Sequence, residues 1–208
     1  MKDINYKQYL FYILFIIITA SGDALAFKGS IGVNAWEAVC QTLNYMSAIK
    51  VGTLMIVLNA SMIIIEAILM KKFKPIMILQ FIVSLLIGSV VNLIVYIFLG
   101  NLTLTSYFSK FLMTIAGFVI SATGNGLLMK CQLAPFPYEG MCEQLSLKIN
   151  VDFAKLRQIF DIVCVVLCIA VSFIGHYQLA IREGTIISML IYSPIMGYVM
   201  KKSKLKFS

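Results

Sequence analysis

Six apolar runs, each about as long as a helix that crosses a lipid bilayer, dominate this sequence. Crossing the hydrocarbon core of a bilayer takes about 20 helical residues. Hydrophobic residues make up 61% of the chain and charged residues only 12%, which is more apolar surface than a soluble domain of 208 residues could bury in one core. The sequence therefore predicts a single all-α membrane domain over residues 1–208, with six spans at residues 8–27, 51–70, 76–99, 107–129, 156–175 and 184–200.

The first run also has the features of a cleavable signal peptide. Lys2 and Lys7 precede it, and the small residues Ala24 and Ala26 lie near its end. A similar stretch recurs in the middle of the chain, where no signal peptidase is expected to cut. We therefore interpret the first run as a retained helix.

The net charge of +8 does not indicate a nucleic-acid partner, because the basic residues are confined to short connections between apolar runs. They are typical of topology signals, since cytoplasmic loops carry an excess of Lys and Arg. With both termini in the cytoplasm, 13 of the 17 basic residues lie inside: Lys2, Lys7, Lys71, Lys72, Lys74, Lys130, Lys148, Lys155, Arg157, Lys201, Lys202, Lys204 and Lys206. We expect a multi-pass protein of the inner or plasma membrane with this orientation.

The two halves of the chain are similar to each other at an offset of 102 residues. Six of 22 ungapped positions are identical, including Glu37 with Glu139, and Trp36 aligns with Tyr138. Residues 1–100 and 101–208 therefore form two predicted repeats of three spans each. Because three is odd, the second repeat enters the membrane upside down, an arrangement common in secondary transporters.

Each repeat has a long connection after its first span, and both connections have helical amphipathic patterns. Glu37, Gln41 and Asn44 share one face in the first repeat, and Glu139 and Glu143 share one in the second. Each connection is predicted to form a short helix. It either lies in the membrane interface or enters the protein as a re-entrant element.

Two short motifs resemble the YczE/YyaS/YitT family of bacterial membrane proteins. The run at residues 32–37 reads GVNAWE where the family commonly reads G-V-S-P-W-D, and residues 183–197 carry the later G-T and S-P-I-M-G elements. Ala35 replaces the usual proline and Glu37 the aspartate, whereas Pro137 keeps the proline in the second repeat. The resemblance covers nearly the whole chain and implies a membrane location and internal repeats.

Glu37 and Glu139 are the acids most indicative of function, because paired carboxylates at a repeat interface suit a cation, an amine or a proton. A structural role is open as well. Asn34 precedes Glu37 by three residues, as in a capping box, and an acid in the first helical turn favours the helix dipole. Asp23 and its counterpart Asn125 are further candidates for the site. For Asp23, a position near the outer boundary of the membrane is the alternative.

Asn59 and its counterpart Asp161 are polar residues inside apolar runs. We expect Asp161 to form a salt bridge with Arg157, one helical turn earlier. Glu66 is expected to extend towards the lysines at the end of its helix. The aromatic pair, Trp36 and Tyr138, serves either as interface anchors or as walls of a ligand cage.

Enzymatic and metal-binding patterns are absent from the sequence. His176 is the only histidine, and the five cysteines form no CxxC pair, so we interpret them as packing residues and expect no cofactor, metal or catalytic role. The leading hypothesis is a small secondary transporter for a cationic or zwitterionic solute. Its predicted substrate-binding residues are Asp23, Trp36, Glu37, Asn59, Asn125, Tyr138, Glu139 and Asp161.

The alternative hypothesis is a membrane accessory or scaffold protein of a biosynthetic or maturation complex that does not transport. A transporter gathers its acids around an enclosed cavity, whereas a scaffold spreads them over rims and caps. Because three helices per half enclose little volume, a homodimer is also predicted.

Overall fold

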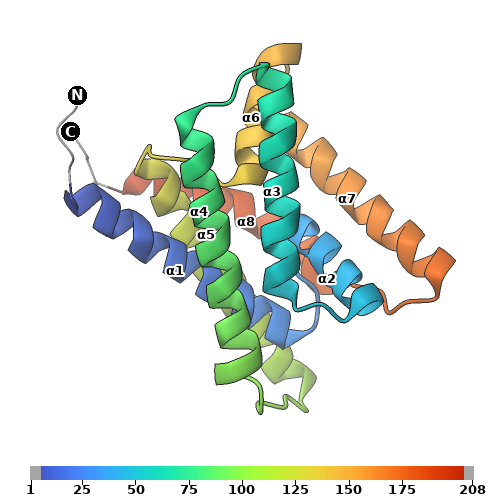
Figure 1. Ribbon diagram of the computed structural model, residues 1–208. Coiled ribbons are helices and arrows are strands. Elements are labelled where there is room, and N and C mark those ends of the chain that lie inside the picture. Colours follow the sequence, from blue (N-terminus) through green and yellow to red (C-terminus); the bar gives the residue numbers. More distant parts are fainter. Residues whose placement is uncertain (1–5, 204–208) are drawn as a thin grey trace.

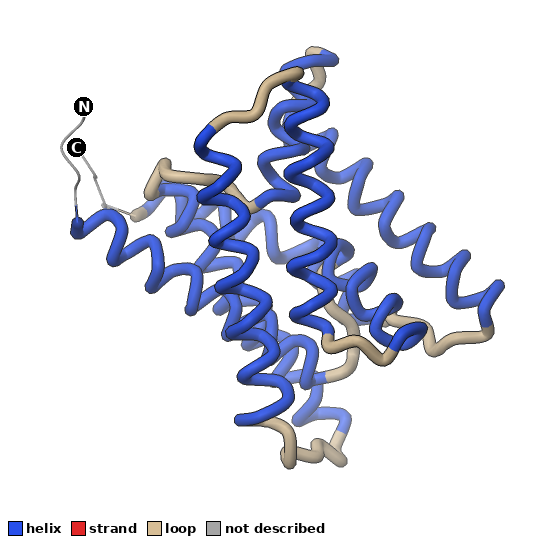
Figure 2. The backbone as a smooth tube through the Cα atoms, viewed as in Figure 1, coloured by secondary structure: helices blue, strands red, loops and turns tan. Residues whose placement is uncertain are grey.

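The structure, a computed structural model, describes residues 6–203 apart from the side chain of Ala154. Within this range it is entirely helical, which confirms the predicted all-α class (Figures 1 and 2). Lys2, Lys204 and Lys206 of the predicted cytoplasmic set lie outside the described residues. The elements are α1 (Tyr6–Gly29), α2 (Ala35–Ser47), α3 (Val51–Met70), α4 (Pro75–Leu93) with the π-helical turn η1 (Ile94–Phe98), α5 (Tyr107–Lys130), α6 (Pro137–Ile149), α7 (Phe153–Gly175) and α8 (Glu183–Lys202).

Five of these helices are long and apolar enough to cross a bilayer: α1, α3, α4 with η1, α5 and α7. The sixth predicted run forms α8, a helix of 20 residues that contains Pro194 and that does not belong to this apolar set. Many large apolar side chains are exposed on the outer helices, among them Ile68, Phe173 and Ile174. Such a surface suits a lipid environment, so the chain is a membrane protein.

Helices α2 and α6 are alike in length and in how they end. Each has 13 residues, or about 20 Å of helix, which is too short to cross the membrane. Each is closed by a residue in the left-handed conformation, Ala48 (φ 56°) and Asn150 (φ 54°), at positions 102 residues apart. In both helices the first turn is mostly buried in the protein, and the last residues, 46–47 and 147–149, are exposed. The two predicted amphipathic helices are therefore present, and they enter the interior.

The centre of the fold is the crossing of α1 and α5, which small residues bring close together. A Cβ atom on Gly22 would lie 2.4 Å from the backbone nitrogen of Ser121, and one on Gly124 would lie 2.8 Å from that of Thr19. Only glycine permits so close an approach of two backbones. Thr19 corresponds to Ser121 and Gly22 to Gly124 in the repeat, so the contact is reciprocal, as at a two-fold interface.

Helix α7 lies at the edge of the molecule. It packs on α2 and α6, and among the described residues none of its Cα atoms lies within 8 Å of one in α8 (Figure 1). Helix α8 packs on α5 instead, and its first turn is tied to the loop after α1 by a hydrogen bond of 2.8 Å from the Gly184 amide to the Ile31 carbonyl. The separation of α7 from α8 leaves a groove beside the site described next.

Candidate functional site

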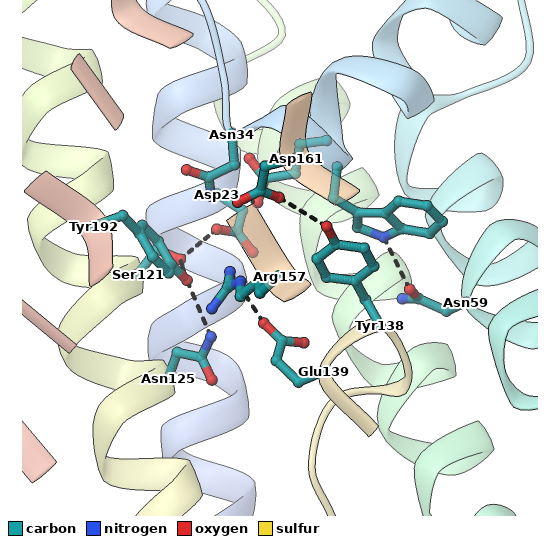
Figure 3. Close-up of polar contacts among 12 residues, drawn as sticks. Asp23, Asn34, Asn59, Ser121, Asn125, Tyr138, Glu139, Arg157, Asp161 and Tyr192 are labelled. Carbon is teal, nitrogen blue, oxygen red and sulfur yellow. Dashed lines mark hydrogen bonds and ion pairs between the residues drawn. The ribbon is translucent and has the colours of Figure 1, made fainter. Parts of the chain in front are cut away.

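A polar cavity of about 60 Å³ lies between the two halves of the chain, and every α-helix contributes to it. Seven of the eight predicted site residues line it, and the eighth, Asp161, is bonded to one of them (Figure 3). The lining residues are Thr19, Asp23, Asn34, Trp36, Glu37, Met55, Asn59, Ile87, Asn125, Phe136, Tyr138, Glu139, Arg157 and Tyr192.

One wall of the cavity consists of Trp36 and Tyr138, whose rings stack with centroids 4.9 Å apart and an interplanar angle of 15°. Each ring donates a hydrogen bond to the polar residue 23 positions later: Trp36 Nε1 to Asn59 Oδ1 at 3.1 Å, and the Tyr138 hydroxyl to Asp161 Oδ1 at 2.8 Å. The structure thus places both rings at the cavity wall rather than on the outer surface, where interface anchors lie.

Glu37, in the first turn of α2, is buried at the cavity. Its Oε1 accepts a hydrogen bond of 3.0 Å from Asn34 Nδ2, while its Oε2 accepts none from a described N–H or hydroxyl donor. The Glu37 carboxyl group also shares a hydrogen bond with the carboxyl group of Asp23. The capping-box expectation is confirmed in part: Asn34 is the N-cap and its backbone N–H bonds to the Glu37 carboxyl group, but the Asn34 side chain binds Glu37 and makes no bond to the helix backbone. Burial raises the pKa of Glu37 above that of an ordinary glutamate, against the lowering effect of its hydrogen bonds.

Glu139, the counterpart of Glu37, is buried too but has a cationic partner. Its Oε1 lies 3.3 Å from Arg157 Nη2. Burial raises the pKa of Glu139, and the guanidinium of Arg157 opposes that rise. Arg157 also has two buried donors, Nε and Nη1, that have no partner among the described residues.

The expected salt bridge between Arg157 and Asp161 is replaced by this contact with Glu139. The reason is tertiary: α6 brings Glu139 to the guanidinium, and Asp161 already accepts the Tyr138 hydroxyl. Arg157 itself was missing from the predicted site, because Met55 holds its place in the first repeat and the search relied on matching polar pairs. The signal that could have found it was an arginine inside an apolar run.

Asp23 is 5% exposed and lines the cavity. Its carboxylate accepts a hydrogen bond from the Ser121 hydroxyl, which lies 3.0 Å from the Tyr192 hydroxyl. Asn125 Nδ2 donates to the same tyrosine at 3.3 Å, while its Oδ1 has no described partner. Ser121 and Tyr192 were not predicted, since hydroxyl residues are common in membrane helices and carry no distinctive pattern.

Glu66 lies outside the site. The expectation that it extends towards the lysines at the end of its helix was wrong. It is buried and accepts a hydrogen bond of 3.0 Å from Gln80 Nε2 of α4. Helix α6 covers the pair, with Gly140 directly against both side chains. The five cysteines are all buried and form no disulfide.

The cavity is chemically asymmetric although the two repeats build it from matching positions. The second repeat supplies Arg157, whereas the first supplies Met55 at the equivalent place. Glu139 therefore has a cationic partner, whereas Glu37 lies against the carboxyl group of Asp23. Buried polar atoms in folded proteins almost always have a partner. Four buried polar atoms of the side chains that line this cavity have no hydrogen-bond donor or acceptor among the described residues: Glu37 Oε2, Asn125 Oδ1, Arg157 Nε and Arg157 Nη1.

Arg157 and Asp161 also line a larger groove of about 670 Å³ between α7 and α8. Its other walls are mainly apolar, and it includes Met129 and Met200 near the ends of α5 and α8. One side chain, Arg157, thus borders both the polar cavity and the groove.

Comparison with known proteins gives a family but no activity. The model of a family described as "Family of unknown function (DUF6198)" matches residues 6–201. The uncharacterized protein YyaS of Bacillus subtilis (strain 168) is 24% identical over 187 residues, which cover 88% of each chain. An uncharacterized protein of Haemophilus influenzae (strain ATCC 51907 / DSM 11121 / KW20 / Rd) is 25% identical over 163 residues, or 74% of this chain and 69% of that one. No solved structure matches. The resemblance to YyaS-like membrane proteins is confirmed.

Proposed function

The chain belongs to the DUF6198 family, and from its cavity we propose that it is a small secondary transporter. It moves a small cationic or zwitterionic solute by alternating access between two inverted repeats of three spans, and it has no enzymatic role. The observation that carries the proposal is the convergence of the buried Asp23, Glu37 and Glu139 on one cavity between the halves of a membrane protein. Transporters of this kind bind substrate near the midplane, between their repeats.

Pairs of equivalent residues that touch each other support the inverted arrangement. A residue can contact its own two-fold equivalent only if it lies close to the two-fold axis. Trp36 stacks on its own counterpart Tyr138, and the contact between Gly22 and Ser121 has its equivalent in that between Gly124 and Thr19. An axis through these contacts lies in the membrane plane if the halves are inserted in opposite directions.

The proposal includes α8 as the sixth span. Its 20 residues extend about 30 Å, enough to cross the hydrocarbon core. Lys201 and Lys202 in its last turn then lie in the cytoplasm together with Lys71 and Lys72 after α3, in the predicted orientation. The homodimer stays a prediction.

The position of the acids favours a transporter over the scaffold alternative. A scaffold is expected to carry Glu37 and Glu139 at opposite rims, whereas each is only 6% exposed at the cavity. Burying carboxylates in a membrane protein is costly, and such residues usually mark a pathway for an ion or substrate.

A ligand screen followed by a transport assay tests the proposal. Purified protein in detergent is screened against small amines, amino acids and other metabolites for a rise in melting temperature. Each hit is then tested for uptake into proteoliposomes, with empty liposomes as the baseline. We expect Glu37→Gln and Glu139→Gln to abolish both stabilisation and uptake, and the exposed control Glu143→Gln to keep both. The proposal is wrong if no solute enters the proteoliposomes, or if both effects survive the two cavity substitutions.

A further inference from the structure

The open polar atoms of the cavity are of two opposite kinds. Arg157 Nε and Nη1 are hydrogen-bond donors that belong to a cationic guanidinium, and Glu37 Oε2 and Asn125 Oδ1 are hydrogen-bond acceptors. All four belong to side chains that line the same small cavity. The N–H groups of Nε and Nη1 point to different sides of the guanidinium, so a carboxylate oxygen accepts a charge-assisted hydrogen bond from one of them. Carboxylate and amide oxygens fit an ammonium group, which has donors only.

From this juxtaposition we propose that the transported solute is a small zwitterion, an α-amino acid of about the size of glycine or alanine. Its carboxylate binds Arg157, and its ammonium group binds Glu37 Oε2 and Asn125 Oδ1. The inference rests on the proposed transport function and narrows its substrate class.

The size of the cavity limits the ligand. Its 60 Å³ holds about four to six water-sized atoms at the 10–15 Å³ that each needs. The ammonium and carboxylate groups must therefore be close together in the ligand, as they are on one α-carbon. Met55, Ile87 and Phe136 provide the apolar part of the lining, which suits a hydrogen or methyl side chain.

Ligands with a single charge fit less well. A simple amine would leave Arg157 Nε and Nη1 buried without a partner, and a simple carboxylate would leave Glu37 Oε2 in the same state. Each unmet buried donor or acceptor is unfavourable, and more so when it is charged. The zwitterion places a group of opposite charge at each end of the cavity, while Glu139 already pairs with the third nitrogen of the guanidinium, Nη2.

Binding of three matched probes to the full-length protein tests the inference. Alanine has both groups, ethylamine only the ammonium, and propionate only the carboxylate. We expect alanine to bind at least tenfold more tightly than either of the other two, as measured by isothermal titration calorimetry in detergent. Equal or tighter binding of ethylamine or propionate would overturn the zwitterion assignment, as would the absence of alanine binding.

Two substitutions separate the two ends of the ligand. Glu37→Gln is expected to weaken alanine and ethylamine binding at least tenfold and to leave propionate binding unchanged. Arg157→Lys keeps the charge beside Glu139 but removes the Nε and Nη1 donors, so it should weaken alanine and propionate binding and spare ethylamine. Both variants are first checked for a single peak in size-exclusion chromatography. If either fails this check, Asn125→Leu, which removes Oδ1, is tested for the same loss as Glu37→Gln.

The outcome for the solute class is distinct from that for transport. If ethylamine, but not alanine, binds and enters proteoliposomes, the zwitterion assignment is wrong and the transporter proposal stands. If alanine binds with the expected pattern but neither it nor any other solute is transported, the site is correct and the transporter proposal is wrong.

Discussion

Trp36 and Tyr138 stack on each other with ring centroids 4.9 Å apart, although 102 residues separate them in the sequence. Each occupies the second position of its short helix, and each donates a hydrogen bond to the polar residue 23 positions later. The same local arrangement of ring and hydrogen bond therefore occurs twice, and the two copies contact each other at the cavity wall. This contact connects the internal repeat, which is a property of the sequence, to the site, which is a property of the fold.

Removing the Tyr138 hydroxyl tests the importance of this design. Tyr138→Phe keeps the stacked ring but takes the donor away from Asp161, and an unpaired buried acceptor costs about 1–3 kcal/mol. We expect a lower melting temperature in detergent. Tyr6→Phe, at a tyrosine that is 81% exposed, is the control and should leave it unchanged. Equal melting temperatures for the two variants would show that the hydrogen bond contributes no stability.

The α1–α5 crossing predicts a contrast between two glycines. Gly22→Ala places a methyl group 2.4 Å from the Ser121 nitrogen, and overpacking of this kind costs about 1–3 kcal/mol. Gly197→Ala meets nothing within 4 Å and should be neutral or stabilising, since alanine is the better helix former. Thermal melts followed by circular dichroism distinguish the two. A stable Gly22→Ala variant would contradict the close crossing.

A double-mutant cycle tests the ion pair of Glu139 and Arg157. Arg157→Met, which introduces the residue of the first repeat, leaves a buried carboxylate unpaired, a change that costs about 3–5 kcal/mol in buried ion pairs. Adding Glu139→Gln should restore part of the stability, because the neutral amide needs no cation. The exposed Arg182→Met is the control for loss of a basic side chain. Additive effects of the two cavity substitutions would argue against a direct pair.

The raised pKa of Glu37 predicts a dependence of stability on pH. The folded protein keeps the Glu37 proton at pH values where the unfolded chain has released it, so the free energy of unfolding falls as the pH rises through the raised pKa. Glu37→Gln should have a flatter profile of melting temperature from about pH 5 to pH 8. Asp23, Glu139, Arg157 and Tyr192 line the same cavity and remain unchanged in this comparison.

The control for that profile is Glu143→Gln, which removes an exposed glutamate of α6. It should follow the wild-type profile over the whole range. If Glu37→Gln does so as well, titration of Glu37 does not govern the stability.

Labelling of single cysteines tests the six-span topology. In a background without the five native cysteines, Lys72→Cys and Lys202→Cys are expected to be protected from a membrane-impermeant maleimide in intact cells. Lys50→Cys and Thr103→Cys, at exposed positions, should react. Reaction of Lys202→Cys but not Lys72→Cys would remove α8 from the set of spans.

The bounds of the helices were largely predictable, because the requirement that sets them is local. A bilayer demands an apolar run of a given length, and the run predicted at residues 51–70 is α3 to the residue. The 102-residue offset likewise located both short helices and seven of the fourteen residues that line the cavity. Helix α8 is the weaker case, since its run is short and contains Pro194.

What the sequence by itself determined is therefore the membrane class, the helices, the repeat and the polar residues worth examining. Only the tertiary structure decided their partners: Arg157 pairs with Glu139 of α6 rather than with Asp161 of its own helix, and Glu66 is covered by α6. The physical reason is that hydropathy and periodicity act along one helix, whereas a buried charge is satisfied by whichever group a neighbouring helix brings within hydrogen-bonding distance. That depends on how α6 and α7 cross, which no residue spacing within either helix specifies.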